Sequence, residues 1–540
     1  MILTQDLSVT IGQVPVLSAV DLRLDPGTIT GLVGESGSGK SMTALAIIGL
    51  LPRHAAASGR IMLDGQNLLT MPETRLCDIR GRRIGMIFQE PMTALNPLMT
   101  IGDQVAEVLR VHHGMDRKAA LSRARARLDR VGLPDPRFPL SLYPHELSGG
   151  QRQRVAIALA IAERPDLLIA DEPTTALDVT TQAQILDLLA GLVRDEGMAL
   201  LLITHDLAVV AGIADRVAVM KSGRIVEEAP TERLFRTQDH PYTRRLFAAS
   251  LHVPARREHE HARSGTTPLL QLRNAVREYR LPQGGRLRAV DDVSLTIRPG
   301  ESVGLVGESG CGKSTLTRAI LGLDPLLGGS IELDGMRVTA GRNMPPKLRA
   351  RMQVVFQDPF GSFDPRWRID RLIAEPFHLT GRPPDWRDQV AGALEEVGLD
   401  ASDARKYIHE FSGGQRQRIA IARALIIRPR LIVLDEAVSA LDVRVRAQVL
   451  DLLADLRRSH DMAYLFISHD LSVVRGITER VLVMQNGRIV EDGRAEQVID
   501  APRHACTQSL VAAMPRIPQA WTARPVPCPG PDISHAGRGA

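Results

Sequence analysis

Two short stretches decide the fold of this chain: Gly34-Glu35-Ser36-Gly37-Ser38-Gly39-Lys40-Ser41 and Gly307-Glu308-Ser309-Gly310-Cys311-Gly312-Lys313-Ser314. Both fit G-x-x-x-x-G-K-[ST], in which glycine N–H groups close on phosphate oxygens, the lysine reaches the terminal phosphates and the serine hydroxyl holds Mg²⁺. Each follows an apolar, strand-like run (29–33, 303–306) and precedes a helix-like run (43–50, 316–323), as the pattern requires. Two matches in matching contexts predict nucleotide binding and an internal duplication.

The duplication continues through the rest of each half. Leu147-Ser148-Gly149-Gly150-Gln151 returns as Phe411-Ser412-Gly413-Gly414-Gln415, Asp171-Glu172 as Asp435-Glu436, and Thr204-His205-Asp206 as Ser468-His469-Asp470. These three elements keep one constant spacing between the copies. Solenoid repeats are far shorter, so the period indicates two whole domains.

Composition and length fit two cytosolic domains. We expect a first domain at 1–251, a charged linker at 252–267, a second domain with an extension at 268–514, and a poorly ordered tail at 515–540. No apolar run has the length of about 18 to 20 residues that spans a bilayer, and the four cysteines lack paired spacing. Net charge is +5, but acids and bases are interspersed, which favours a solvated surface over a nucleic-acid platform.

Local patterns predict the framework around the loops. Asp64-Gly65 and Asp334-Gly335 stand between alternating segments, which predicts hairpins with type I′ turns. The runs 199–203 and 463–467 are continuously apolar, as expected of parallel strands buried on both faces. The arginines beside the S-G-G-Q elements (Arg152, Arg154, Arg416 and Arg418) are interpreted mainly as surface charges on a helix.

The ordered set of motifs resembles a tandem ATP-binding-cassette ATPase. In both halves the loop, a glutamine after phenylalanine, S-G-G-Q, Asp-Glu and histidine follow that family's order. The resemblance implies an α/β fold of two tandem P-loop NTPase domains, each with a mainly parallel RecA-like sheet, an antiparallel β subdomain and a helical signature subdomain. It also implies ATP as substrate and Mg²⁺ as cofactor.

Site residues follow from the same match. Glu172 and Glu436 can polarise the attacking water. We expect catalytic roles for these two and for His205, His469, Gln89 and Gln357. The resemblance implies metal contacts from Ser41, Gln89, Asp171, Ser314, Gln357 and Asp435. Nucleotide contacts are expected from Gly34, Ser36, Gly37, Gly39, Lys40, Ser41, Gly307, Ser309, Gly310, Gly312, Lys313, Ser314 and Thr315.

The S-G-G-Q elements open helical stretches, so their backbone N–H groups form a second anion site. By the resemblance, each closes on nucleotide held by the opposite domain. The loop of Lys40 would then pair with Ser412, Gly413, Gly414 and Gln415, and the loop of Lys313 with Ser148, Gly149, Gly150 and Gln151.

Adenine recognition is expected to differ between the halves. Family members stack adenine on an aromatic residue about two dozen positions before the loop. The second half supplies Tyr279 there, whereas the first half places Ile11. An aliphatic side chain lacks the stacking geometry of a ring, so the first site is expected to hold ATP more weakly unless another side chain covers the adenine.

Segments 89–97 and 357–365, with His240-Pro241-Tyr242-Thr243-Arg244, resemble the oligopeptide, dipeptide and nickel uptake branch. This implies an importer ATPase on the cytoplasmic face of the inner membrane, attached through two permease subunits and fed by a periplasmic or lipid-anchored binding protein. The segments 92–108 and 360–377 are the expected docking surfaces for the permeases. Cys506 and Cys528 fall short of the four thiolates of an iron–sulfur cluster, so none is expected.

Two alternatives remain at this stage. A nickel or other small-solute importer would use the same ATPase, because this subunit does not touch the cargo. A soluble tandem cassette acting on ribosomes or DNA is disfavoured. The linker is short and unlike the long helical linker of ribosome-acting relatives, and the zinc-binding cysteine clusters of DNA-repair relatives are missing from the sequence.

Overall fold

The computed structural model describes residues 1–89, 94–175, 177–254, 267–280, 284–358, 360–439 and 441–521. These residues form two compact units. The first is built from residues 1–175 and 185–252, and the second from residues 253–514. Residues 177–184 group with the second unit and residues 515–521 with the first. Most of the expected linker (255–266) and most of the expected tail (522–540) lie outside the described residues.

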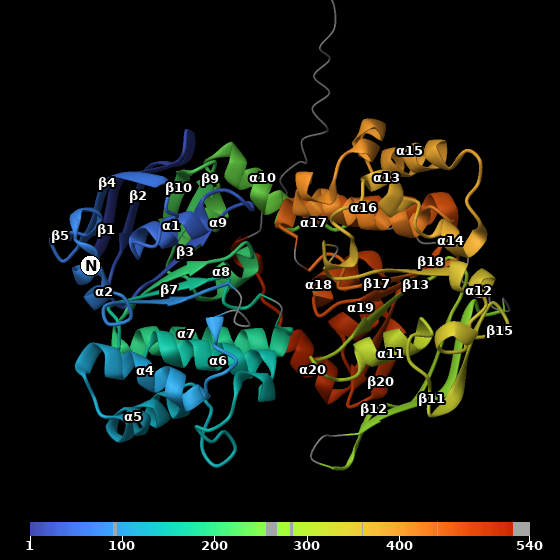
Figure 1. The fold of residues 1–540 in the computed structure, drawn as a ribbon, viewed down its shortest axis with the longest axis horizontal. Coiled ribbons are helices and arrows are strands. Elements are labelled where there is room, and N and C mark those ends of the chain that lie inside the picture. Colours follow the sequence, from blue (N-terminus) through green and yellow to red (C-terminus); the bar gives the residue numbers. More distant parts are fainter. Residues whose placement is uncertain are drawn as a thin grey trace, which may run out of the picture. The chain divides into compact units, whose positions relative to one another are not determined.

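The first half alternates strands and helices in the order typical of a parallel α/β core (Figure 1). Its strands are β1 (Ile2–Ile11), β2 (Val14–Leu24), β3 (Ile29–Val33), β4 (Ala55–Leu63), β5 (Gln66–Asn67), β6 (Ile84–Ile87), β7 (Leu167–Asp171), β8 (Ala199–Ile203), β9 (Arg216–Lys221) and β10 (Arg224–Pro230). Its α-helices are α1 (Lys40–Ile47), α2 (Glu73–Ile79), α4 (Ile101–His113), α5 (Arg117–Arg130), α6 (Gly149–Ala160), α7 (Val179–Glu196), α8 (Leu207–Ile213), α9 (Thr231–Thr237) and α10 (Pro241–Ser250).

The second half repeats this order of elements. Its strands are β11 (Leu270–Arg280), β12 (Arg286–Ile297), β13 (Ser302–Val306), β14 (Gly328–Leu333), β15 (Met336–Arg337), β16 (Met352–Val355), β17 (Leu431–Asp435), β18 (Ala463–Ile467), β19 (Arg480–Gln485) and β20 (Arg488–Arg494). Its α-helices are α11 (Lys313–Ile320), α12 (Pro346–Ala350), α13 (Ile369–Ile373), α14 (Phe377–Thr380), α15 (Trp386–Glu396), α16 (Gly413–Leu425), α17 (Val443–His460), α18 (Leu471–Ile477), α19 (Ala495–Asp500) and α20 (Ala505–Ala512).

Each half contains a six-stranded sheet and a four-stranded antiparallel sheet. The six-stranded orders are β10-β9-β3-β8-β7-β6 and β20-β19-β13-β18-β17-β16, and the four-stranded orders are β2-β1-β4-β5 and β12-β11-β14-β15. In both large sheets the strand before the phosphate loop is central and runs parallel to its two neighbours. The carboxyl ends of these parallel strands therefore meet at one edge, which is where α/β sheets bind ligands.

The local expectations about strands and turns are confirmed. β8 and β18 are fully buried along their whole length. Asp64 and Gly65 have φ of 46° and 84°, and Asp334 and Gly335 have 55° and 73°, the left-handed pair that a type I′ turn needs. The helices after the phosphate loops begin at Lys40 and Lys313, three residues earlier than the apolar pattern indicates, because the apolar pattern cannot see a polar first turn.

The chain's last described segment packs on the first unit. Ile517 and Trp521 lie against the apolar cluster that contains Phe235 and Phe247, and the Trp521 ring is 5.6 Å from that of Phe235. No helix among the described residues is long and apolar enough to cross a membrane.

Candidate functional site: two phosphate loops with carboxylate–histidine pairs

In both phosphate loops the lysine is hydrogen-bonded to the backbone of its own loop. Lys40 Nζ donates to the carbonyl oxygens of Gly34 and Glu35, each at 2.9 Å. Lys313 Nζ donates to those of Gly307 and Glu308 at 2.6 and 2.9 Å. The lysines are buried, and the next residues on α1 and α11, Ser41 and Ser314, are exposed at the loop. This arrangement sets a cation and a hydroxyl at the mouth of each loop.

Glycine is required where each loop turns into its helix. Gly39 and Gly312 cap α1 and α11 with φ of 107° and 114°, in the left-handed region. A Cβ on Gly312 would overlap the carbonyl oxygen of Ala289, and one on Gly39 would press on the Leu17 side chain. Because no side chain caps either helix, the first backbone N–H groups are available for an anion.

A carboxylate–histidine pair lies at the end of the neighbouring strands in each half. His205 Nδ1 is 3.1 Å from Glu172 Oε1, and His469 Nδ1 is 3.3 Å from Glu436 Oε1. Both glutamates adopt left-handed backbone angles, with φ of 48° and 49°. A non-glycine residue rarely takes such angles, and strain of this kind clusters at functional sites.

The pKa values show that both glutamates are held as carboxylates. Burial pushes the pKa of Glu172 upward, but the hydrogen bond and charge of His205 outweigh it and lower the pKa to about 2. The pKa of Glu436 is lowered by His469 against the same burial. Burial alone would lower the pKa of His469, yet Glu436 raises it. An ionised carboxylate at this place can orient a water molecule and accept its proton.

The preceding aspartates fit a magnesium ion. Burial raises the pKa of Asp171 above its ordinary value although Ser41 hydrogen bonds to it, and burial also raises that of Asp435. Asp171 Oδ1 is buried and has no hydrogen-bond partner among the described residues. A cation next to this oxygen would offset the burial cost, and a carboxylate with a serine hydroxyl is a usual Mg²⁺ donor set. The residues present therefore fit the ion.

The two glutamines behave differently. Gln89 Nε2 donates to Glu172 Oε2 at 2.9 Å, so the first half brings Gln89, Glu172 and His205 into one group. Thr175 also donates to that oxygen, at 3.0 Å. Both glutamines are exposed, but among the described residues Gln357 makes no hydrogen bond to Glu436 like that of Gln89 to Glu172. The catalytic roles of these side chains stay predictions.

Each S-G-G-Q element starts a helix with a full capping box. Ser148 caps α6, with Gln151 N donating to its Oγ at 3.4 Å and its own N donating to Gln151 Oε1 at 2.9 Å. Ser412 and Gln415 repeat these contacts at the start of α16, at 3.4 and 3.0 Å. Gly149 and Gly413, the first residues of the two helices, are exposed, which leaves their backbone N–H groups open to an anion. Pairing of each element with the opposite loop stays a prediction from the resemblance.

Tyr279 and Ile11 occupy equivalent strand positions, near the ends of β11 and β1. The Arg277 guanidinium lies 4.7 Å from the Tyr279 ring centre, and the Tyr279 hydroxyl donates to Asp324 Oδ2 at 3.1 Å. These contacts fix the ring in place. Its contact with adenine stays a prediction.

The arginines after S-G-G-Q are not simple surface charges. Arg154 donates to the carbonyl oxygen of Val131 at 2.7 Å, and Arg418 does the same to Val397 at 2.7 Å. Burial lowers the pKa of both guanidinium groups. The sequence interpretation was wrong here, because a helical charge pattern does not show that a neighbouring helix ends with carbonyls facing that side.

One contact to the first loop could not be predicted from the sequence. Tyr242, on α10 of the C-terminal extension, accepts a hydrogen bond from the backbone N of Glu35 at 3.1 Å. Lys221 Nζ lies 5.2 Å from the centre of the Tyr242 ring. The equivalent residue on α20 is Cys506, which has no phenol oxygen to accept this bond. The segment His240-Pro241-Tyr242-Thr243 indicates the peptide-uptake branch from its sequence. The contact of Tyr242 with the loop depends on how α10 packs, which the sequence pattern does not show.

A family model described as ABC transporter matches residues 17–175 and 290–439, which together are more than half of the chain. The chain belongs to this family. A model described as the oligopeptide/dipeptide transporter C-terminal region matches residues 226–275 and 490–539. The chain is therefore a fused tandem ABC ATPase of the peptide-importer type, as its sequence predicted, and it hydrolyses ATP.

Two relatives resemble this ABC ATPase over nearly its full length. The peptidoglycan transport ATP-binding protein YejF of Agrobacterium fabrum is 48% identical, covering 94% of this chain and 95% of its own. The glutathione import ATP-binding protein GsiA of Salmonella typhimurium is 45% identical, covering 93% and 87%. The solved structure of cbiO1 from Clostridium perfringens is 26% identical with a TM-score of 0.40, covering 44% of this chain and 92% of that one.

Proposed function

We propose that this ABC ATPase uses Mg²⁺ and ATP to drive uptake of short peptides or peptide-like solutes through two permease subunits. The observation that carries the ATPase part is the repeated carboxylate–histidine pair, at 3.1 Å in the first half and 3.3 Å in the second. Both pairs stand at the carboxyl end of a central parallel sheet, beside a phosphate loop.

The peptide class rests on the extension and on the relatives. The C-terminal region typical of oligopeptide and dipeptide transporters is matched in both halves. The relatives are named for peptidoglycan transport and glutathione import. Glutathione is a tripeptide and peptidoglycan carries short peptides, so both names support a peptide-like cargo.

The residues that would hold magnesium are Ser41 and Asp171 in the first half and Ser314 and Asp435 in the second, with Gln89 and Gln357 as further oxygen donors. The bound ion would neutralise charge on the phosphates. Glu172 and Glu436 would orient the water and accept its proton, while His205 and His469 keep these carboxylates ionised.

The permeases and a periplasmic or lipid-anchored binding protein would place the chain on the inner face of the cytoplasmic membrane. Adjacent genes that encode permeases and a binding protein would supply the components for a direct test. The full chain is co-expressed with both permeases, and the purified complex is reconstituted in proteoliposomes. It should hydrolyse ATP faster when a peptide-loaded binding protein is added. Stimulation by nickel or another small solute, and not by peptides, would overturn the cargo class.

A further inference from the structure

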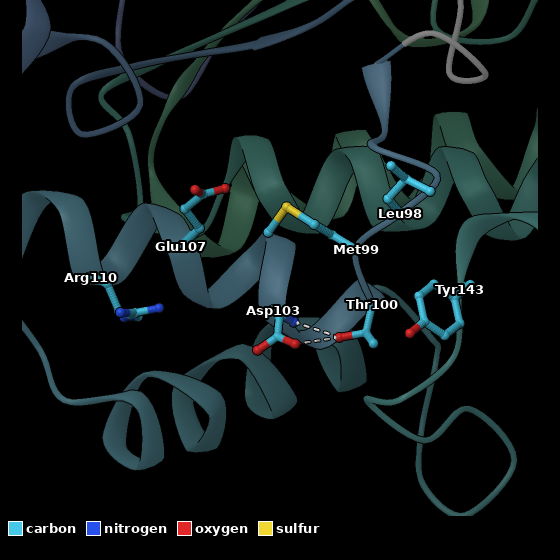
Figure 2. Close-up of a pocket in the computed structure, with 7 residues that line it drawn as sticks. All are labelled: Leu98, Met99, Thr100, Asp103, Glu107, Arg110 and Tyr143. Atoms are coloured by element: carbon cyan, nitrogen blue, oxygen red, sulfur yellow. Dashed lines mark hydrogen bonds between the residues drawn. The ribbon is translucent and has the colours of Figure 1, made fainter.

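The first half has an open hollow at the start of α4, inside its expected docking segment. The hollow has a volume of about 230 Å³ and is lined by Leu98, Met99, Thr100, Asp103, Glu107, Arg110 and Tyr143 (Figure 2). Thr100 caps α4, donating to Asp103 Oδ2 at 2.9 Å and accepting from Asp103 N at 3.2 Å. Leu98 is 85% exposed, the highest exposed fraction among the large apolar side chains that the structure describes.

The second half has an equivalent surface, which is held by the same backbone hydrogen bond. Ile101 N donates to the carbonyl oxygen of Leu142 at 2.8 Å, and Ile369 N donates to that of Lys406 at 3.0 Å. The residues that follow these carbonyls are Tyr143 and Tyr407. Each stacks on a histidine two positions later, with ring centres 5.7 Å apart in both halves. The segment from Arg366 to Arg371 therefore corresponds to the lining from Leu98 to Asp103.

Three side chains at this shared place change from neutral or acidic to basic. Where the first half has Leu98, Thr100 and Asp103, the second has Arg366, Arg368 and Arg371. Met99 is replaced by Trp367, whose ring lies 3.8 Å from the Arg371 guanidinium. Arg368 lies 6.0 Å from the Tyr407 ring. The first surface, where Arg110 and Arg117 offset Asp103 and Glu107, is thus mainly apolar, and the second is cationic and aromatic.

Neighbouring charges leave that contrast in place. In the first half Asp103 is paired with Arg117 at 3.0 Å. In the second half Asp364 pairs with Arg366 at 2.8 Å, and Glu375 faces Arg423 at 3.8 Å. Among the described residues, the side chains of Arg368 and Arg371 contact aromatic rings and form no ion pair. Three arginines (Arg366, Arg368 and Arg371) stand here against the two carboxylates of Asp364 and Asp370, so the second surface keeps a net positive charge next to Trp367 and Tyr407.

We propose that the two docking surfaces take chemically different permease segments: an apolar segment on the hollow beside Leu98, and a segment bearing carboxylates on the face formed by Arg368 and Arg371. This inference rests on the proposed importer function and adds which kind of segment goes to which half. An acidic segment gains charge-assisted contacts on the second face and would leave a desolvated carboxylate beside Asp103 on the first. The assignment therefore fixes which permease each half drives.

The test uses the full chain co-expressed with both permeases encoded next to it. A photo-reactive benzoylphenylalanine is placed at Leu98 in one variant and at Arg366 in the other, because both side chains are 85% exposed and form a matched pair. Cross-linked peptides are then identified by mass spectrometry. We expect position 98 to capture an apolar cytoplasmic segment of one permease, and position 366 to capture an acidic segment of the other.

A second variant tests the charge itself. Arg371→Glu should lower recovery of the permease captured at position 366 at least tenfold, and changing a carboxylate of the captured segment to lysine should restore it. Basal ATPase activity of the isolated chain reports that the variant folds. Capture of one and the same segment at both positions, capture of lipid or nucleic acid at position 366, or unchanged recovery with Arg371→Glu would overturn the inference. Failure of the wild-type chain to recover any permease would overturn the proposed function as well.

Discussion

The two halves can be compared at their phosphate sites and at their docking surfaces. At the phosphate sites, the glutamate–histidine distances differ by only a few tenths of an ångström, and the two glutamates share φ of 48° and 49°. At the proposed docking surfaces, Asp103 in one half corresponds to Arg371 in the other. The glutamate–histidine pairs have kept one geometry in both halves, while the surfaces that we propose to bind different permease segments have diverged.

The residues around the two phosphate loops show a smaller difference. The first loop receives a hydrogen bond acceptor from Tyr242, and the second has Cys506 at that position. Tyr279 has its counterpart in Ile11. The nucleotide sites are therefore alike in the residues that handle phosphate and unlike in the residues around them, which predicts differences in affinity and not in chemistry.

The largest expected effect is the loss of ATP turnover when one of the two glutamates is replaced, which tests whether the two sites are equivalent. Glu172→Gln and Glu436→Gln should each leave ATP binding intact and lower turnover, because a positioned base contributes about 10² to 10⁴ in rate. The double variant should retain ATP without hydrolysing it. Steady-state ATPase activity and nucleotide retention in the assembled transporter measure this. If Glu172→Gln kept wild-type turnover, the first half would not be a working hydrolytic site.

A second prediction sharpens the difference at the adenine. Tyr279→Ala should weaken nucleotide binding in the second half, and Ile11→Tyr should tighten it in the first, each by roughly threefold to tenfold, since an aromatic contact contributes about 0.5 to 1.5 kcal/mol. Affinities measured with a fluorescent ATP analogue would decide. An unchanged affinity for Ile11→Tyr would mean that another side chain covers the adenine in the first half.

Tyr242 gives a prediction for the first half alone. Tyr242→Phe removes the acceptor for Glu35 N and should weaken nucleotide binding there by about fivefold, because a hydrogen bond contributes on the order of 1 kcal/mol. The matched control is Cys506→Ala, which removes no such bond. Equal losses in both variants, read from ATP affinity, would mean that the extension acts by packing and not through this bond.

The smallest expected effect concerns pH. His469 has a pKa raised above 6.5 by Glu436, so its ion pair should stabilise the second half below pH 6.5 and lose that contribution as pH rises through the raised value. His469→Gln should therefore lower the unfolding temperature most at acidic pH and least at alkaline pH. Thermal scans of the full chain between pH 6 and 9 check this, and a gap that widens with rising pH would contradict it.

Much of this architecture could be predicted from sequence because the motifs constrain their own surroundings. The loop pattern requires a strand before it and a helix after it, and Asp-Gly requires the left-handed pair found at Asp64 and Gly65. Contacts set by distant packing could not be predicted. The carbonyl bonds of Arg154 and Arg418 and the reach of Tyr242 to Glu35 depend on how helices lie, which periodicity does not encode.

The left-handed backbone angles of Glu172 and Glu436 could not be predicted from the sequence either, because glutamate rarely adopts them. The change from Asp103 to Arg371 between the two proposed docking surfaces can be seen in the sequence alone. Its meaning required the equivalence of Tyr143 and Tyr407, which the matching backbone bonds of Ile101 and Ile369 provide.

The central claim, that both halves hydrolyse ATP in response to a peptide-loaded binding protein, has one direct test. The wild-type chain is assembled with its permeases in proteoliposomes and given a photo-reactive ATP analogue together with vanadate. Vanadate traps the diphosphate that hydrolysis forms, and light then links it covalently to the loop that holds it. We expect label in both loops, 34–41 and 307–314, and more label when peptide-loaded binding protein is added. Label confined to one loop, or label that does not respond to peptide, would contradict it.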